Sequence, residues 1–227
     1  MKYLSSASIG AIMMSAATMS SAATVDFEGF SSGDVLATDV NLGGGIVADI
    51  SALGGTNPAV IFDTDAVTGG DVDLASPFAN SVSGALRDFG NILIVQENAP
   101  APGAPIVPDD AVGGTLTFDF ATLISLTEVF LIDTAQGSFV SLLLDGALVQ
   151  TQTVVDLNVS DTSNVQTPNE FTLFDFGGAV GDTLIVSYSE SGALGEFKVS
   201  VVPVPASLLL LIGGFGLMAL MRSRSNA

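Results

Sequence analysis

The stretch that decides the fold is Gly114-Thr115-Leu116-Thr117-Phe118-Asp119-Phe120. Apolar and polar side chains alternate along it, which places the three large apolar side chains on one face of an extended chain and Thr117 and Asp119 on the other. This period of two is typical of a β-strand with one face against a hydrophobic core. The stretch therefore predicts such a strand over 116–120.

Similar short runs recur on both sides of this stretch, and helical spacing is sustained nowhere. The other expected strands are 24–28, 59–62, 92–95, 126–132, 139–144, 148–155, 171–174, 184–189 and 196–201. Asp145-Gly146 predicts a type I′ hairpin turn between two of them, because both central residues of that turn need a positive φ. Many short strands with glycine-rich turns and almost no helix indicate an all-β fold, an antiparallel β-sandwich or jelly roll.

A proline-rich segment, 98–110, interrupts the predicted strands. Its prolines lack backbone donors, so we expect an extended, exposed loop there. The strands after it would need another sheet to cover their apolar face, so the segment is not expected to divide the body into two domains. We therefore expect one domain, residues 24–201, which is long enough to bury a sizeable core.

The composition narrows the possible chemistry. The sequence has no cysteine and no histidine, which excludes disulfides, thiol or imidazole nucleophiles, serine triads and most zinc sites. All 24 acidic residues lie in the body, whose two bases are Arg87 and Lys198, so that its formal charge is −22. Such a charge repels nucleic acid and anionic lipid and attracts divalent cations. Solubility in a salty medium is the alternative interpretation of this charge.

The stretch 63–73 is the first candidate metal site. Two Asp-x-Asp pairs, Asp63 with Asp65 and Asp71 with Asp73, flank a Thr-Gly-Gly turn. Four carboxylates on one loop would repel each other without a cation, and calcium prefers such hard oxygen ligands. The spacing is not that of an EF-hand, since no glutamate closes a twelve-residue loop. The alternative is a solvated, turn-forming acidic loop.

A second candidate calcium site joins the two ends of the body. Asp26 and Glu28 lie on the first expected strand and Glu196 on the last, and the three carboxylates can meet only if those strands are neighbours. This arrangement resembles jelly-roll carbohydrate-binding modules that hold a structural calcium in that place. Calcium is the only cofactor that these residues suggest.

The first 23 residues have the character of a secretory signal peptide. Lys2 precedes a short apolar region that ends in Ser21-Ala22-Ala23, small residues suited to signal peptidase, and the segment holds no acid. Cleavage after Ala23, or alternatively after Ala22, would start the mature chain near Thr24. We therefore expect the body to be exported.

Residues 202–227 combine a proline motif, an apolar run and a basic tip. In Val202-Pro203-Val204-Pro205-Ala206, each proline removes a backbone donor and favours an extended predecessor, so that a helix can begin only near Ala206. The uncharged run to Met221 would span roughly 24 Å as a helix, against a hydrocarbon core of about 30 Å. Arg222 and Arg224 follow it, and bases beside an apolar segment tend to stay cytoplasmic. We expect a single, marginal transmembrane helix.

This C-terminal segment resembles the sorting signal of the PEP-CTERM class, most closely its VPLPA-CTERM variant, with Val204 in place of the leucine. The resemblance implies cleavage near the proline motif by a membrane-embedded exosortase. It also implies a Gram-negative bacterium that makes exopolysaccharide. The alternative is an ordinary tail anchor that is never cut.

The body resembles, loosely, the exported domains that often precede this sorting signal. The similarity rests on the motifs Asp26-Phe27-Glu28, Phe62-Asp63-Thr64-Asp65, Thr68-Gly69-Gly70-Asp71, Gly114-Thr115-Leu116-Thr117-Phe118-Asp119-Phe120 and Ser191-Gly192-Ala193. It implies a β-sandwich and brings no established activity.

Few residues are suited to stacking on a sugar. There is no tryptophan, and Tyr3 leaves with the signal peptide. Tyr188 shares a strand face with Leu184 and Val186, so it is expected in the core, as are most of the 14 phenylalanines. Among 24 acidic residues, a carboxylate pair at glycosidase spacing is uninformative, and no glutamate lies in a catalytic motif.

These observations favour an exported, non-catalytic protein of the cell surface or extracellular matrix that works with exopolysaccharide. It would be held in the membrane before processing and would not bind nucleic acid. The alternative is a calcium-dependent, lectin-like carbohydrate-binding module, and the third candidate is an uncharacterised hydrolase.

Overall fold

The computed structural model describes residues 22–54, 57–98, 104–111, 113–155 and 170–203. All of these residues except Pro203 belong to one compact unit, Ser21–Val202. The predicted signal peptide and C-terminal helix lie almost wholly outside these ranges. Within them, no helix is long and apolar enough to cross a membrane.

The described residues form strands and one short 3-10 helix. In chain order the elements are β1 (Ala23–Val25), β2 (Val35–Leu36), β3 (Val40–Asn41), β4 (Val47–Leu53), β5 (Ala59–Asp63), η1 (Val72–Leu74), β6 (Phe78–Asn80), β7 (Leu86–Arg87), β8 (Asn91–Val95), β9 (Gly114–Ile132), β10 (Phe139–Leu144), β11 (Ala147–Thr153), β12 (Glu170–Tyr188) and β13 (Ala193–Val201). Among them, every strand pair is antiparallel except β6 with β12. The prediction of an all-β, antiparallel fold is confirmed.

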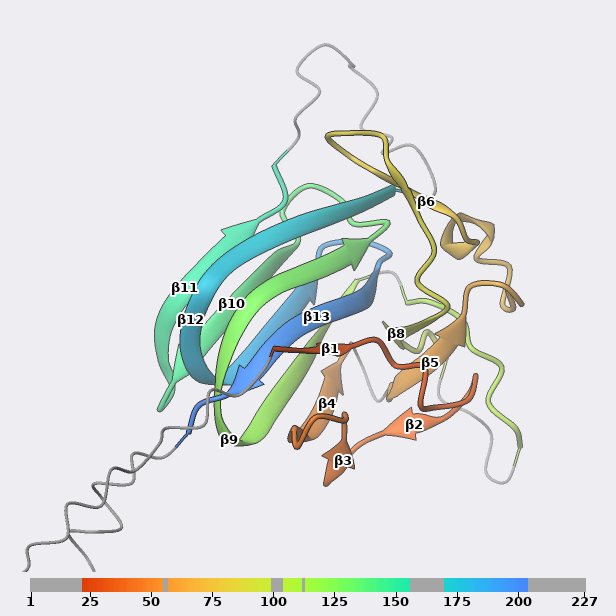
Figure 1. Ribbon diagram of the computed structural model, residues 1–227. Helices are drawn as coiled ribbons and strands as arrows, with labels where there is room; N and C mark the ends of the chain where they lie inside the picture. The colour runs from red at the N-terminus through yellow and green to blue at the C-terminus, as the bar shows by residue number, and fades with distance from the viewer. Residues whose placement is uncertain (1–21, 55–56, 99–103, 112, 156–169, 204–227) are drawn as a thin grey trace, which may run out of the picture. The chain divides into compact units, whose positions relative to one another are not determined.

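The long strands β9 and β12 form the middle of the sheet. Their pairing runs from Gly114↔Tyr188 to Ile132↔Phe171. On its other edge, β9 pairs first with β4 and then with β13, so that it must turn from one neighbour to the other near residues 121–123. Figure 1 shows both long strands strongly curved. One continuous sheet thereby wraps around its own core.

A glycine bulge in β12 accommodates this curvature. The register of β12 against β9 shifts between Asp175 and Ala179, where Gly177 and Gly178 have φ of 60° and 83°. Residues other than glycine rarely adopt such backbone angles, and a β-bulge increases the local bend and twist of a strand. The Ser125 hydroxyl donates a hydrogen bond to the Gly178 carbonyl oxygen at 2.9 Å, which fastens the bulge to β9.

The predicted strands agree with the structure except where a long strand bends, where strands are very short, and at β4. The runs 116–120 and 126–132 are parts of one strand, β9, and the runs 171–174 and 184–189 belong together to β12. The first strand ends at Val25 rather than residue 28, because Phe27 has a φ of 59°. The sequence interpretation missed β2, β3, β4, β6 and β7, of which only β4 is longer than three residues.

The hairpin between β10 and β11 is confirmed. Asp145 and Gly146 have φ of 51° and 76°, and the closing pair of the turn is Leu144↔Ala147. Positive φ at both central positions is what a type I′ turn requires.

The core has two layers on either side of β5 and β8. Alternate residues of these strands point to opposite sides, so that Ile61 and Leu93 join the larger cluster under β4, β9, β12 and β13, whereas Phe62 and Ile92 join the smaller one. In the described ranges, every phenylalanine is buried except Phe30 and Phe139, which are half-buried. The prediction that the phenylalanines and Tyr188 are core residues is confirmed.

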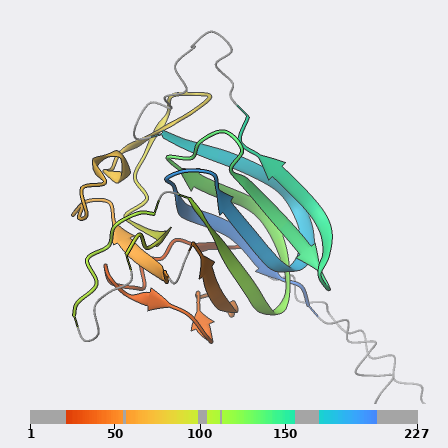
Figure 2. The same cartoon turned by 180° about the vertical axis from the view of Figure 1, so that it is seen from behind.

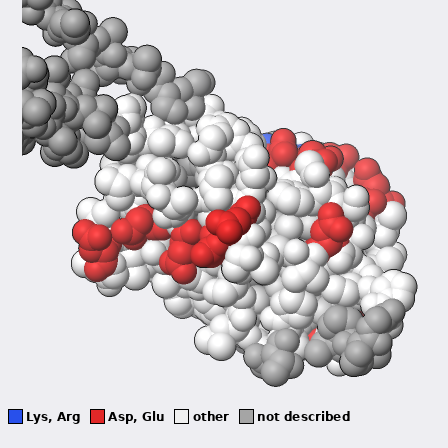
Figure 3. Space-filling view, turned by 90° about the horizontal axis from the view of Figure 1, so that it is seen from below, with Lys and Arg blue, Asp and Glu red and all other residues white. Residues whose placement is uncertain are grey.

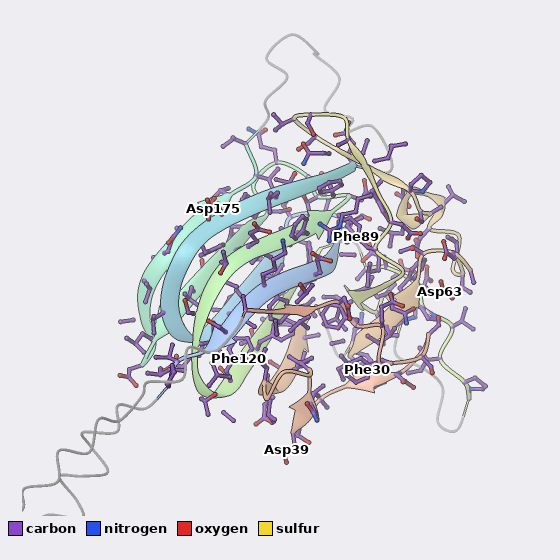
Figure 4. The ribbon with its side chains drawn as sticks, viewed as in Figure 1. Phe30, Asp39, Asp63, Phe89, Phe120 and Asp175 are labelled. Carbon is purple, nitrogen blue, oxygen red and sulfur yellow. The ribbon has the colours of Figure 1, made fainter. Side chains whose placement is uncertain are left out.

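An ion pair stands at the edge of the smaller cluster. The Arg87 guanidinium on β7 lies 2.5 Å from an oxygen of Glu196, whose side chain is 7% exposed. Its central carbon also lies 4.8 Å and 4.3 Å from the ring centres of Phe89 and Phe130. Figure 4 shows Phe89 in the interior beside these strands. Arg87 therefore ties the β6–β7 hairpin to the sheet and neutralises a buried carboxylate.

Replacing Arg87 should destabilise the protein far more than replacing the other base of the body. Arg87→Ala leaves the Glu196 carboxylate buried without its partner, at a cost of about 3 kcal/mol. Lys198→Ala, the matched control, breaks a more exposed ion pair with Glu128 and should cost less than about 1 kcal/mol. Urea unfolding of the full-length protein measures both, and equal losses would show that the burial of Glu196 does not matter.

Candidate functional site

The structure separates the two Asp-x-Asp pairs of the predicted loop. Asp63 ends β5 and lies opposite Asn91, the first residue of β8. Its carboxylate accepts a hydrogen bond at 2.9 Å from the backbone N–H of Asp65, which makes a local turn. Figure 4 shows Asp63 at this end of β5, away from the curved strands.

Asp71 and Asp73 turn instead toward residues from other parts of the chain. Asp71 precedes η1 and Asp73 lies within it, and an Asp71 oxygen accepts a hydrogen bond at 2.8 Å from the backbone N–H of Asp110. The Thr68 hydroxyl donates to the Pro108 carbonyl oxygen at 2.7 Å. These bonds hold the loop before η1 against the end of the proline-rich segment.

Gly69 permits this close approach. Its φ is 70°, and a Cβ atom there would collide with the Asp109 carboxylate. Any other residue would therefore be strained in its backbone and would push the two loops apart. The Thr-Gly-Gly turn thus serves to bring carboxylates together, although with different partners from those predicted.

Asp110 and Asp133 meet at the common end of three neighbouring strands. Ala193 of β13 pairs with Ile132 of β9 on one side and with Ile94 of β8 on the other. Asp133 follows β9 directly, and Asp110 forms an isolated bridge with Gln96, just beyond β8. Figures 1 and 2 show these strands side by side from both directions.

The turn before β13 links the two carboxylates. The Ser191 hydroxyl donates to an Asp110 oxygen at 2.6 Å and lies 3.4 Å from an oxygen of Asp133. The backbone N–H of Gly192 donates to the same Asp110 oxygen at 2.9 Å. We call Asp71, Asp73, Asp109, Asp110 and Asp133 the carboxylate cluster.

Burial and mutual repulsion raise pKa values within the cluster. The pKa of Asp110, which is 8% exposed, rises to about 8, chiefly because burial disfavours the charged form. Burial and the charge of Asp73 raise the pKa of Asp133 to about 7. Burial also raises the pKa of Asp71, although its hydrogen bond from Asp110 opposes the change. The fully ionised cluster is therefore unfavourable in free energy, and either protonation or a bound cation would relieve it.

The Tyr188 hydroxyl lies beside the cluster without a hydrogen-bond partner in the described part of the chain. Tyr188 is 5% exposed, and its ring packs against Gly192. Burial and then the charge of Asp110 raise the pKa of this hydroxyl. A buried donor without an acceptor is unusual in a folded protein.

The cluster has no cationic side chain to balance it within the described ranges. Arg87 and Lys198 are engaged with Glu196 and Glu128. The described carboxylates nevertheless do not form a group of three or more already arranged as ligands around one metal ion. Instead, they approach each other in pairs. Asp71 approaches Asp109 and the backbone of Asp110, and Asp73 approaches Asp133. The Ser191 hydroxyl lies between Asp110 and Asp133.

The second predicted site is also divided. β1 and β13 are neighbours, as that prediction required. However, Glu196 pairs with Arg87, and Glu28 accepts a hydrogen bond at 2.7 Å from the backbone N–H of Asn91. Asp26 is exposed and accepts a bond from the backbone of Glu28. These contacts occupy the three carboxylates separately.

Several residues of the site were not predicted from the sequence. Asp109, Asp110, Asp133 and Tyr188 were not candidate ligands, and 98–110 was expected to be exposed, whereas Asp110 is buried. The available signal was positional: Asp133 directly follows a predicted strand, and Ser191-Gly192 directly precedes one. Which strand ends meet depends on strand order, and no local pattern reveals that order.

A surface hollow lies elsewhere. It has a volume of about 470 Å³ and is lined by Phe30 and residues 34–41, around β2 and β3. None of the carboxylate cluster contributes to it. Figure 4 places Asp39 at this periphery of the molecule.

Without calcium, stability should fall as the pH rises from 5 to 8. The folded protein retains protons on Asp110 and Asp133 that the unfolded chain releases above about pH 4, because folding raises both pKa values. Each retained proton lowers the free energy of unfolding by about 1.4 kcal/mol per pH unit until the pH passes the folded pKa. Thermal unfolding in a chelator measures this, and Asp110→Asn should flatten the dependence. A melting temperature that stays constant over this range would contradict the raised pKa values.

Comparison with known proteins identifies no family. No protein-family model matches the chain, and no curated protein matches it. A solved structure of a fucose-binding module from Streptococcus pneumoniae superimposes with a TM-score of 0.28 and 15% sequence identity, over 50% of this chain and 72% of that chain. At that TM-score the likeness shows neither a shared family nor a shared ligand.

Proposed function

We propose that the protein is an exported, non-catalytic component of the cell surface or extracellular matrix that works with exopolysaccharide. In this proposal an exosortase-like enzyme acts at Val202–Ala206, after the C-terminal helix has held the chain in the membrane. The observation that carries the proposal is the position of the domain boundary. The last described strand, β13, ends one residue before the predicted sorting motif.

The contacts at the end of β13 define this boundary. β13 ends at Val201, and the backbone N–H of Val202 still donates to the Leu123 carbonyl oxygen at 2.9 Å. Pro203 is exposed and belongs to no strand. Cleavage beyond this point would therefore leave every strand of the described fold intact.

The start of the domain fits removal of a signal peptide. β1 begins at Ala23, which pairs with Val199 and packs against the larger core cluster. Cleavage after Ala22 would preserve the whole of β1, whereas cleavage after Ala23 would remove its first residue. The pairing therefore favours the first of these positions.

The described surface offers little for stacking a sugar. Within the described ranges no aromatic side chain is fully exposed, and the half-buried Phe30 is the one aromatic that lines the hollow around β2 and β3. Figure 3 shows acidic side chains in several groups on one face, with very little basic surface. Such a surface stays hydrated and repels other polyanions, as suits a protein dispersed in a matrix.

A calcium-dependent carbohydrate-binding module is the second candidate. The carboxylate cluster favours it, because a calcium ion there would be a hard acceptor for further oxygen ligands such as sugar hydroxyls. A hydrolase receives less support. Asp110 and the half-buried Asp133 lie outside the hollow at residues 34–41, whereas a glycosidase needs its two carboxylates across a cleft.

Mass spectrometry of the protein from its producing cells tests the sorting step. We expect the mature chain to begin at Ala23 or Thr24 and to lack residues 208–227. A variant with Pro203→Ala and Pro205→Ala should retain those residues, because the extended motif that precedes the helix is lost. An intact C-terminus in the wild-type protein would instead identify an ordinary tail anchor.

Native electrophoresis through gels containing exopolysaccharide distinguishes the proposed matrix component from a carbohydrate-binding module. We expect no retardation that free sugar competes away, because no aromatic side chain of the described surface is fully exposed for stacking. Retardation that requires calcium and disappears with one free sugar would favour the carbohydrate-binding module. Serum albumin run in the same gel controls for sieving.

A further inference from the structure

We propose that the carboxylate cluster binds one calcium ion, which fastens the η1 loop and the proline-rich segment to the ends of β9 and β13. The ligand set differs from either predicted site, since it takes only Asp71 and Asp73 from the first and nothing from the second. The inference is independent of C-terminal processing and of any sugar ligand.

The charge balance is the first support. Asp110 is buried and Asp133 is half-buried, and both hold an oxygen near the Ser191 hydroxyl. No described lysine or arginine contacts them. Buried carboxylates are normally protonated, paired with a cation or bound to a metal, because isolating their charge from water is costly. A divalent ion would satisfy several of these carboxylates at once.

The Tyr188 hydroxyl is a second and independent support, because Tyr188 is a residue of the larger core cluster and not one of the carboxylates. It is buried, it has no hydrogen-bond partner among the described residues, and it faces the charge of Asp110. A water bound to the ion could serve as the missing hydrogen-bond partner of this hydroxyl, because calcium commonly retains water among its six to eight oxygen ligands. The hydroxyl therefore points to a missing polar species at this place.

The topology explains why the ion would matter for stability. The carboxylates come from segments far apart in sequence, and these meet only at the end of β8, β13 and β9. The hydrogen bonds from the Asp110 backbone to Asp71 and from Thr68 to the Pro108 carbonyl already hold the two loops together. An ion bound by all five carboxylates would cross-link three segments, which are the η1 loop, the proline-rich segment and the end of β9.

Calcium suits this site better than magnesium. The ligands lie on loops and strand ends, where Asp71 approaches Asp109 and the backbone of Asp110, and Asp73 approaches Asp133. Calcium accepts irregular shells of carboxylate, hydroxyl and water oxygens, whereas magnesium requires a near-ideal octahedron and gives up its water reluctantly.

The chain offers a sharp control in Asp65. Asp63 lies opposite the first residue of β8, whereas Asp110 bridges to Gln96, just beyond its last residue. At about 3.3 Å per residue these positions are roughly 17 Å apart along the strand. Asp65 is exposed, and its backbone N–H bonds to the Asp63 carboxylate. Asp65→Asn removes an equal charge from the predicted loop, and Asp65 is not among the groups that raise the pKa values of Asp71, Asp110 and Asp133.

Thermal unfolding of the full-length protein in detergent, in a chelator and in calcium chloride, tests the site. At about 100 times the dissociation constant we expect calcium to raise the melting temperature by about 5 to 10 °C in the wild type and in Asp65→Asn. Magnesium at the same concentration should raise it less. Asp110→Asn and Asp133→Asn should lose most of the rise. They should nevertheless melt in chelator at or above the wild-type temperature, because an amide keeps the acceptor and does not titrate, so that folding has neither to bury its charge nor to protonate it.

Titration calorimetry with calcium chloride gives a second readout that does not depend on unfolding. We expect one site in the wild type and in Asp65→Asn, with affinity reduced at least tenfold in Asp110→Asn. The proposal fails if the wild type neither binds calcium nor gains stability from it. It also fails if the cluster variants respond like the wild type, or if Asp65→Asn removes the response.

Discussion

The pairing of β9 with β12 is the interaction on which the rest of the structure depends. Each strand has 19 residues, and β9 offers its second edge to β4 and then to β13. Because β9 has to bend between these two neighbours, the sheet closes around a core without help from helices. The glycine bulge in β12 allows the second long strand to follow the first.

This arrangement also places the chemically interesting residues. Once β13 lies between β9 and β8, the residues that flank their common end are brought together wherever they occur in the sequence. Asp133, Ser191 and Asp110 meet for this reason. The long pairing thus builds the core and, at one end, a concentration of negative charge that no described basic residue offsets.

Local patterns in the sequence predicted most of the longer strands and the core but not the site. Alternation around Phe118, the Asp145-Gly146 turn and the burial of the phenylalanines follow from side-chain period and turn geometry, and all were confirmed. The bend in β9 was missed because alternation breaks at residues 121–123, which divides one strand into two apparent ones. The burial of Asp110 was missed because it depends on Ser191, 81 residues away, and proline content alone favours an exposed loop.

Terbium luminescence tests most directly whether a cation binds between these strand ends. Terbium replaces calcium at oxygen sites and emits when a nearby tyrosine transfers energy to it, and the chain has two tyrosines and no tryptophan. We expect emission on excitation of tyrosine, displacement of terbium by calcium, and loss of the emission in Tyr188→Phe. Absence of sensitised emission, or emission that survives Tyr188→Phe, would contradict a cation site beside Tyr188.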